Sequence, residues 1–286
     1  MQERGISLFV KREDLIHPYL SGNKWHKLKY NLEEAKRQNE KTLITFGGAY
    51  SNHIYAVAAA GKIFKFNTIG IIRGEEHLPL NPTLSFATAS GMKLYYVDRK
   101  TYRNKNSGEF IQKLNHEFGD FYLIPEGGTN ELAVKGCSEI FSGLNAFDYY
   151  CCACGTGGTI AGIINGLEGK KYALGFAVLK GASFLKNDVQ KFIRNINNKN
   201  FSNWEINLDY HFGGYAKLNK QLLKFVSDFT TKTNIPIEPI YTGKMFFGIY
   251  DLISKGYFKE GTKIVALHSG GLQGLKGLTM RGKMLK

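Results

Sequence analysis

The stretch AFDYYCCACGTGGTIAGIINGL, residues 146–167, decides the fold class of this chain. Its first part, residues 146–153, is an apolar run with the length of a buried strand. A glycine-containing loop follows at residues 155–158, and a helix is expected from about residue 159 to residue 167. A strand that passes through a glycine turn straight into a helix is typical of proteins with parallel sheets.

The same alternation of strand and helix covers most of the chain. Before this stretch, the pattern predicts strands at residues 41–46, 67–72, 93–97 and 121–124 and helices at 51–64, 82–90 and 109–118. After it, the pattern predicts strands at 172–178 and 262–267 and helices at 182–196, within 215–233 and at 245–255. We therefore predict an α/β protein with two open parallel-sheet domains and a small ligand in the cleft between them. The large, ligand-binding domain comprises residues 1–28 plus 132–286, and the small α/β domain comprises residues 29–131.

The composition excludes several classes of protein. The 286 residues are 43% hydrophobic, which allows a sizeable core and excludes wholesale disorder. The chain has no run of about 20 apolar residues, so it contains no candidate membrane-spanning helix. Its first ten residues lack the pattern of a signal peptide, so we expect a cytoplasmic protein. The net charge of +14 permits binding to nucleic acid, but the basic residues are spread along the chain, which favours an anionic small molecule.

The four cysteines are Cys137, Cys151, Cys152 and Cys154. Three of them crowd into one apolar run, which is a poor arrangement for a disulfide framework in a chain of this size. No second Cys or His pair stands at metal-ligand spacing, so we expect no metal site. The run is therefore predicted to be a buried strand with free thiols.

A first candidate for chemistry is Lys24, in the segment Ser21-Gly22-Asn23-Lys24. A lysine forms an imine with an aldehyde cofactor only after losing its proton, and its free pKa is near 10.4. Desolvation or cationic neighbours must therefore lower that pKa, and Lys27 and Lys29 are close in sequence. Taken alone, the segment indicates an ordinary surface lysine, because lysine is rarely buried, and only the other motifs give Lys24 a chemical role.

A second candidate is the loop Gly155-Thr156-Gly157-Gly158-Thr159. Glycines let the backbone close on a ligand, the free N–H groups of the following helix suit a phosphate, and the threonines add hydroxyl donors. The loop lacks the Gly-Lys-Ser/Thr ending of a nucleoside-triphosphate loop and the Gly-x-Gly-x-x-Gly spacing of a dinucleotide site. A plain turn is the alternative interpretation.

Two further segments carry polar groups at expected turns. In Gly47-Gly48-Ala49-Tyr50-Ser51-Asn52-His53, Ser51 is either a helix cap or a ligand for a substrate carboxylate, and Asn52 is suited to donate to a phenolate oxygen. His53 is expected to be structural. The segment His268-Ser269-Gly270-Gly271 follows the last strand, where ligands of parallel sheets bind. Tyr215 and Tyr241 also follow strand-like runs, although either ring would suit a core.

Taken together, these motifs resemble the fold type II enzymes that use pyridoxal 5'-phosphate (PLP), the tryptophan synthase β-like group. Within that group the chain is similar to the family of D-cysteine desulfhydrase and 1-aminocyclopropane-1-carboxylate (ACC) deaminase. The resemblance runs from about Phe9 to Leu275, with the motifs in order and at comparable spacing. It implies a PLP-dependent lyase that deaminates a small amino acid, in a protein that is commonly a homodimer.

The resemblance also implies a role for each candidate residue. Lys24 would be the Schiff-base lysine and would remove the Cα proton of the substrate. Lys27 and the loop of Gly155, Thr156, Gly157, Gly158 and Thr159 would bind the cofactor phosphate. Asn52 would face the phenolate oxygen of the cofactor, and Ser51 would bind the substrate carboxylate or assist proton transfer. Tyr215 and Tyr241 would line the substrate side, while Thr242 and Ser269 would lie near the pyridine nitrogen and the substrate.

Thr242 and Ser269 bear on the choice of reaction within the family. Members that open the ACC ring carry Glu and Leu at these positions, whereas desulfhydrase-like members carry hydroxyl residues. A hydroxyl partner would leave the pyridine nitrogen largely unprotonated, which favours prompt β-elimination. The resemblance therefore favours conversion of D-cysteine to pyruvate, sulfide and ammonia over conversion of ACC to 2-oxobutanoate and ammonia.

The chain departs from the family pattern at several places. Tyr50 stands where relatives usually have Gln, Cys154 is unusual beside the phosphate loop, and relatives carry a further stretch before the first motif. The first and last of these departures keep open a catalytically inactive relative that still binds PLP. The net charge keeps open a basic nucleic-acid-binding protein, although no nucleic-acid motif supports it.

Overall fold

The computed structural model describes residues 5–144, 146–280 and 282 of the chain. The chain divides into two compact units. The larger comprises Met1–Lys27 and Asn130–Lys286, and the smaller comprises Leu28–Thr129. Each unit contains its own parallel sheet, so the prediction of an α/β protein with two parallel sheets is confirmed.

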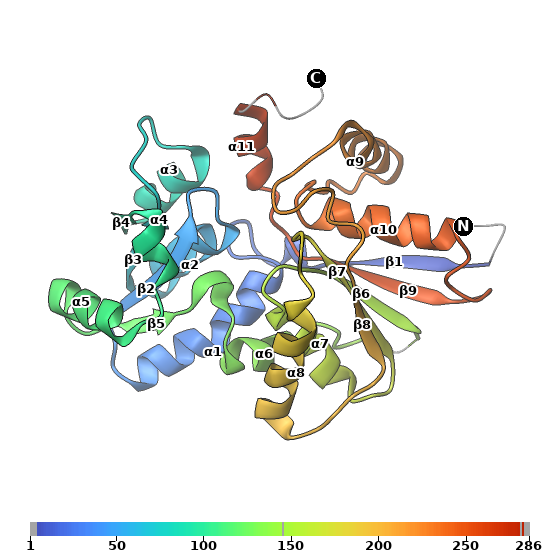
Figure 1. Cartoon of the computed structure of the whole chain (residues 1–286), viewed down its shortest axis with the longest axis horizontal. Helices are drawn as coiled ribbons and strands as arrows, with labels where there is room; N and C mark the ends of the chain where they lie inside the picture. Colours follow the sequence, from blue (N-terminus) through green and yellow to red (C-terminus); the bar gives the residue numbers. More distant parts are fainter. Residues whose placement is uncertain (1–4, 145, 281, 283–286) are drawn as a thin grey trace. The chain divides into compact units, whose positions relative to one another are not determined.

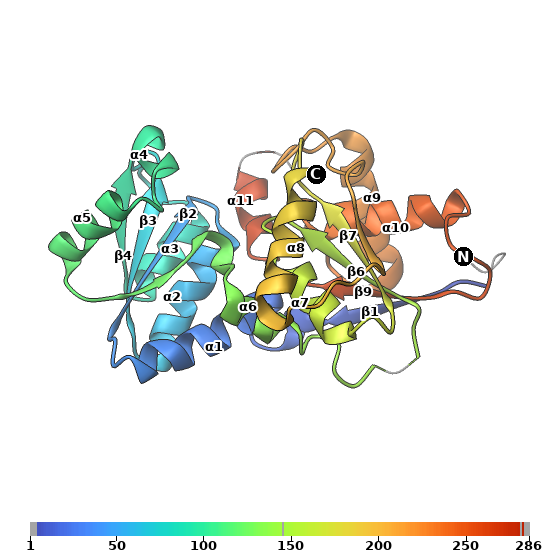
Figure 2. The same ribbon diagram turned by 60° about the horizontal axis from the view of Figure 1, so that its bottom comes forward.

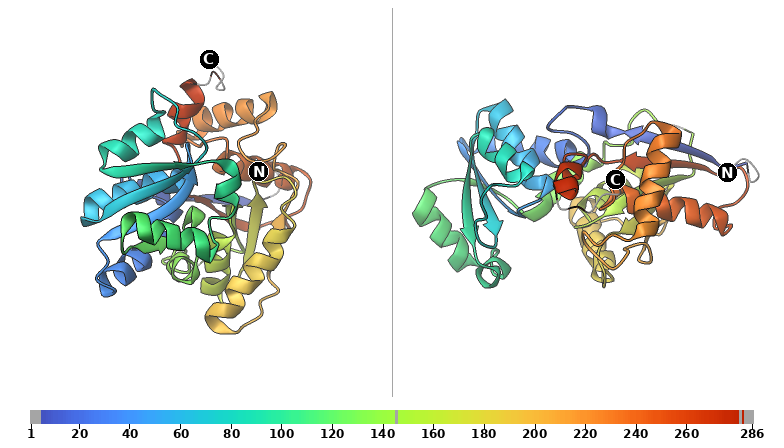
Figure 3. Two further views of the ribbon diagram at one scale, coloured as in Figure 1. Left: turned by 60° about the vertical axis from the view of Figure 1, so that its left-hand side comes forward. Right: turned by 90° about the horizontal axis from the view of Figure 1, so that it is seen from above.

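The sheet of the larger unit has five parallel strands in the order β1-β9-β6-β7-β8. These strands are β1 (Ser7–Arg12), β9 (Lys263–His268), β6 (Tyr149–Cys154), β7 (Tyr172–Ala177) and β8 (Trp204–Asn207). Figure 3 shows β1, in blue, running alongside β9, in orange-red. The first and last strands of the unit are therefore hydrogen-bonded neighbours, which brings the motifs that follow them together.

Helices cover both faces of this sheet. One face bears α6 (Glu131–Cys137), α7 (Gly158–Leu167) and α8 (Phe184–Asn197), and the other bears α9 (Lys220–Thr233) and α10 (Thr242–Ser254) (Figure 1). Side chains alternate along β6: Tyr150, Cys152 and Cys154 pack towards the first face, whereas Cys151 packs towards the second. A strand buried on both sides needs apolar residues at every position, which explains the unbroken apolar run in the sequence.

All four cysteines are buried and free, and the three on β6 confirm the predicted buried strand. Burial raises the pKa of Cys151, and the Cys154 thiol together with burial raises that of Cys152. These groups are therefore neutral thiols that behave as small hydrophobic side chains in the core.

The smaller unit contains a four-stranded parallel sheet in the order β4-β3-β2-β5. Figure 2 labels its strands β2, β3 and β4. Its strands are β2 (Thr42–Gly48), β3 (Asn67–Arg73), β4 (Met92–Val97) and β5 (Tyr122–Ile124). Tyr102 and Phe110, from helices α4 (Arg99–Arg103) and α5 (Gly108–Phe118), pack with Phe46 of β2 on one face. Helix α2 (Asn52–Phe64) packs on the other face, where a Cβ on Gly47 would lie 2.5 Å from Ile54. Helix α3 (Pro82–Ala89) packs beside α2.

Several elements differ from the sequence prediction. The strand expected from residue 146 begins only at Tyr149, after Asp148, whose carboxylate accepts the backbone N–H of Lys263. The helix expected from residue 245 begins at Thr242, whereas the helix expected within 215–233 is confirmed as α9, Lys220–Thr233. The elements that had no prediction are mostly short or lie at sheet edges: β1, β8, α1 (Asn23–Arg37), α4, α6, α11 (Gly274–Met280) and the 3-10 turns Glu13–Leu15 and Glu126–Gly128. Among the described residues, each helix is too short or too polar to cross a membrane.

A substitution in α7 tests the close packing of helices under the larger sheet. A Cβ on Gly162 would overlap the Cβ of Cys137 and lie 2.6 Å from the carbonyl oxygen of Val134, both on α6. Because neither helix backbone can move away cheaply, we expect Gly162→Ala to lower the free energy of unfolding by about 1–3 kcal/mol. Denaturant titration followed by circular dichroism measures this change. Gly108→Ala is the control, since its Cβ would meet open space at the start of α5. Equal unfolding midpoints for the two variants would contradict the packing argument.

Candidate active site

Lys24 stands in the first turn of α1, immediately after a close approach of two backbones. Gly22 has φ of +63°, and a Cβ there would overlap the carbonyl oxygen of Ser269. The Gly22 N–H donates to the carbonyl of Glu13 at 2.8 Å, which fixes the turn from the other side. Glycine is thus required at position 22, because it alone tolerates both the positive φ and the contact. The turn that presents Lys24 is held against the segment that carries Ser269.

The environment of Lys24 favours its neutral amine. Burial lowers the pKa of Lys24 well below its usual value, and the charge of Lys27 lowers it further. Each of these effects favours a nucleophilic lysine, since only the unprotonated amine attacks a carbonyl carbon. Burial also lowers the pKa of Lys27.

The glycine loop is tied directly to the first turn of α1. The Asn23 side chain donates to the Thr159 hydroxyl at 2.9 Å, and Lys27 Nζ donates to the Thr156 hydroxyl at 3.4 Å. Gly157 precedes α7 with φ of +77°, and Gly158 begins that helix. The loop therefore offers the N–H groups of a helix start, two hydroxyls and an adjacent lysine, which is a donor set that fits a phosphate group.

Tyr215 and Tyr241 lie beside one another near this loop. Their ring centroids are 5.9 Å apart in an edge-to-face arrangement, and a Cβ on Gly155 would lie 3.3 Å from Tyr241 Cε1. Tyr215 remains exposed, with 44% of its surface accessible. The structure thus brings the glycine loop and both tyrosines together within the larger unit.

A fully buried lysine holds the loop that carries Tyr215. Lys244, on α10, donates from Nζ to the carbonyl oxygens of Gly214 at 2.7 Å, His211 at 2.9 Å and Val178 at 3.4 Å. Burial lowers the pKa of Lys244 to about 8, while the carboxylate of Glu238 acts in the opposite direction. Lys244 was not predicted from the sequence, because nothing in its local pattern distinguishes a buried lysine from an exposed one.

Thr242 begins α10, and both its backbone N–H and its hydroxyl are hydrogen-bonded to Glu238. The Glu238 carboxylate accepts the backbone N–H groups of Ile240, Tyr241 and Thr242 at 2.7, 2.9 and 2.6 Å, so it caps the helix from four residues upstream. The Thr242 hydroxyl lies 3.1 Å from the same carboxylate and is fully buried. Burial raises the pKa of Glu238 to about 7, against the opposing effect of these N–H donors. This cap explains why α10 begins three residues earlier than the sequence predicts.

Ser51, Asn52 and His53 belong to the smaller unit. Ser51 caps α2, accepting the N–H groups of His53 and Ile54 at 3.2 and 3.3 Å, which confirms the capping interpretation. His53 is buried, and its Nε2 lies 2.8 Å from the Thr45 hydroxyl. That hydroxyl donates to the carbonyl of Ile124, so His53 donates to it in turn and joins α2 to β2 and β5. Asn52 is the first residue of α2 and is half-buried.

Comparison with known proteins places this chain in a family. Residues 1–270 match the family model described as "Pyridoxal-phosphate dependent enzyme". A putative ACC deaminase of Pyrococcus furiosus is 32% identical over 94% of this chain and 86% of its own length. A bifunctional D-cysteine desulfhydrase/ACC deaminase of Arabidopsis thaliana, described as mitochondrial, is 32% identical over 95% of this chain and 74% of its own length.

Solved structures agree with the fold. An ACC deaminase homologue matches with a TM-score of 0.85 and 27% identity, over 98% of this chain and 89% of the other. A hydrogen sulfide-producing enzyme of Fusobacterium nucleatum matches with a TM-score of 0.68 and 16% identity, over 96% and 93% of the two chains. At that identity the second match supports the fold alone. The family and fold inferred from the motifs are confirmed.

The requirement for glycine at position 22 is testable with a matched control. Gly22→Ala adds a methyl group against the Ser269 carbonyl, so we expect the turn before Lys24 to open and the melting temperature to fall. Gly181→Ala places alanine at a similar φ of +71° where nothing lies within 4 Å. Thermal unfolding of both variants separates the cost of the contact from the cost of positive φ. A fall in melting temperature no larger for Gly22→Ala than for Gly181→Ala would refute the role given to the contact.

Proposed function

Because the chain belongs to the family of pyridoxal-phosphate dependent enzymes, we propose that it deaminates a small amino acid with the cofactor carried on Lys24. The best candidate for the substrate is D-cysteine, converted to pyruvate, sulfide and ammonia. One observation carries the assignment of Lys24: its burial lowers the amine pKa in a turn that is tied to a phosphate-type loop.

The residues of the larger unit fit the cofactor. The phosphate would be held by Gly155, Gly157, Gly158 and the hydroxyls of Thr156 and Thr159, with Lys27 supplying positive charge. The Asn23–Thr159 hydrogen bond supports this proposal, because it joins the helix of the lysine to the loop of the phosphate. When bound, PLP withdraws electrons from the Cα of an amino acid and so acidifies its proton.

The remaining steps belong to side chains of this chain. A neutral Lys24 is able to accept the Cα proton of the substrate, and positioned proton transfer of this kind contributes about 10²–10⁴-fold to a rate. Tyr215 and Tyr241 would line the substrate, with Tyr215 on the accessible side. Ser51 would bind the substrate carboxylate, and Asn52 would donate to the phenolate oxygen. By the same resemblance we expect the enzyme to be a homodimer.

The two hydroxyl residues Thr242 and Ser269 support β-elimination from D-cysteine, because a hydroxyl partner would leave the pyridine nitrogen of the cofactor largely unprotonated. Ser269 is half-buried at the end of β9, while the Thr242 hydroxyl is hydrogen-bonded to Glu238. A hydroxyl has one proton and two lone pairs. Thr242 directs its proton at Glu238 and accepts the Glu238 N–H, so one lone pair is left for a ligand. Ser269 is therefore the more available hydroxyl of the two.

ACC is the second candidate substrate, with 2-oxobutanoate and ammonia as products. The names of the Pyrococcus furiosus and Arabidopsis thaliana relatives favour it, since both include ACC deaminase. Replacing both hydroxyl residues, as in Thr242→Glu with Ser269→Leu, should move activity from D-cysteine towards ACC. An unchanged ratio of the two activities would rule out these positions as the determinants of substrate.

The assignment of Lys24 and of the substrate is tested in one assay. PLP-loaded protein is offered D-cysteine, L-cysteine, D-serine and ACC in parallel, and keto acid release is measured. We expect pyruvate from D-cysteine and no turnover by Lys24→Ala, because this variant lacks both the attachment point and the base. Lys29→Ala, on the same helix, is the control and should retain activity. Release of 2-oxobutanoate alone would establish ACC as the substrate, and PLP binding without turnover of any of the four would indicate an inactive relative.

A further inference from the structure

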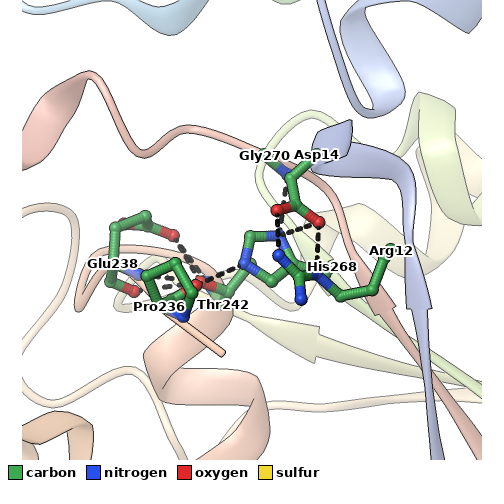
Figure 4. A network of polar contacts seen from close by, with 7 residues as sticks. All are labelled: Arg12, Asp14, Pro236, Glu238, Thr242, His268 and Gly270. Carbon is green, nitrogen blue, oxygen red and sulfur yellow. Dashed lines mark hydrogen bonds and ion pairs between the residues drawn. The ribbon is translucent and has the colours of Figure 1, made fainter. Parts of the chain in front are cut away.

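His268 ends β9 immediately before Ser269, and its side chain is fully buried. Its Nε2 lies 2.6 Å from the carbonyl oxygen of Pro236, and its Nδ1 lies 3.3 Å from the backbone nitrogen of Gly270 (Figure 4). The two ring nitrogens therefore contact two separate segments of the larger unit. None of the roles discussed above involves this residue.

The two partners determine where the proton of the ring lies. A carbonyl oxygen only accepts, so Nε2 carries the proton and donates it to Pro236. The Gly270 N–H only donates, so Nδ1 keeps its lone pair and accepts. The ring is thus neutral in a defined tautomer, which agrees with the lowering of the pKa of His268 by burial.

Each segment that His268 contacts leads to residues of the proposed site. Gly270 follows Ser269, whose carbonyl lies against Gly22, two residues before Lys24. Pro236 is two residues before Glu238, the carboxylate that caps α10 and bonds to Thr242. Figure 4 shows the His268 ring between Pro236 on one side and Gly270 on the other. His268 is therefore the side chain that joins the Ser269 turn to the segment leading into α10.

We propose that His268 is a positioning residue, which in its neutral form holds the Ser269 turn and the Pro236–Thr242 segment in the geometry that the cofactor requires. This inference rests on the proposed function, because that function places Ser269 and Thr242 beside the cofactor. It assigns His268 no contact with substrate or cofactor. Its effect is exerted through the backbone of Gly270 and the carbonyl of Pro236.

The surroundings of His268 also make this arrangement sensitive to acid. Asp14 Oδ1 lies 3.4 Å from Nδ1, and the same carboxylate is held by Arg12 in a two-point ion pair at 2.8 Å. Protonation of the ring would place a proton on Nδ1. That proton would favour Asp14 and would prevent Nδ1 from accepting the Gly270 N–H. The charged groups acting on the ring are thus Asp14, which favours protonation, and Arg12, which opposes it.

The direction of the pH effect follows from the lowered pKa. The folded-state pKa of His268 lies below its ordinary value of 6.5, so the unfolded chain takes up the proton first as the pH falls. The stability that neutral His268 contributes is complete above pH 6.5 and is lost as the pH falls through the folded-state value. We expect the affinity for PLP and kcat/KM to decline as the pH falls through the folded-state pKa of His268, which lies below 6.5.

Two substitutions separate the hydrogen bonds of His268. His268→Asn puts an acceptor near the position of Nδ1 and loses the bond to Pro236, while His268→Gln puts a donor near Nε2 and loses the bond from Gly270. Because the proposal requires both bonds, we expect either variant to bind PLP more weakly and to lose kcat/KM on the order of 10²-fold, as a misplacement of about 1 Å does. The acid decline due to His268 should vanish from both pH profiles. His116→Gln, at an exposed position on α5, is the control and should match the unmodified enzyme.

The readouts distinguish this proposal from the function on which it rests. Nitrogen-15 spectra of the imidazole rings of the PLP-loaded, unmodified enzyme should show His268 with a protonated Nε2 and an unprotonated Nδ1 at neutral pH. A protonated Nδ1 would overturn the proposal even if neither variant folds. Unchanged PLP affinity with an unchanged acid decline in both variants would also overturn it. Failure of the unmodified, PLP-loaded enzyme to process any of the four amino acids would instead reject the proposed function, while the spectra and PLP affinities would still test His268.

Discussion

The approach of Gly22 to the Ser269 carbonyl is the contact on which the candidate site depends. Through it, the turn before Lys24 meets the segment that follows the last strand of the larger sheet. The neighbouring positions of β1 and β9 make the meeting possible, since parallel neighbours deliver their carboxyl ends to the same edge. A methyl group at position 22 would be enough to separate the two segments.

Two buried charged groups of the larger unit, Glu238 and Lys244, are held by backbone partners. Glu238 is held by three N–H groups and Lys244 by three carbonyl oxygens. Such bonds satisfy a buried polar group while fixing the loops that supply the partners. Lys24 differs, because its burial with Lys27 nearby lowers its pKa and favours a reactive, neutral amine. Both lysines are thus desolvated, but buried Lys244 fixes three loop carbonyls, whereas burial of Lys24 favours a reactive amine.

The sequence predicted the fold class well because β6, its glycine loop and α7 are governed by local patterns. A strand buried on both faces has to be apolar throughout, and α7 follows the glycine turn directly. The edge strands β1 and β8 were missed because partly exposed strands lack that signal, and α1 because its polar first turn was interpreted only as a candidate site. Lys244, Glu238 and His268 could not be identified from spacing. Their roles come from burial and from partners distant in the chain, which no local pattern records.

The buried cysteines make local unfolding of the larger unit measurable by thiol labelling. All four belong to the larger unit, and all four are buried. A thiol reagent therefore reacts only when that unit opens, whereas opening of the smaller unit leaves no thiol to label. Since Cys152 and Cys154 lie on the strand that leads into the glycine loop, their labelling rate would follow the local stability of the cofactor loop. Ligands that bind this loop should slow the labelling, because binding to the closed form stabilises it by mass action.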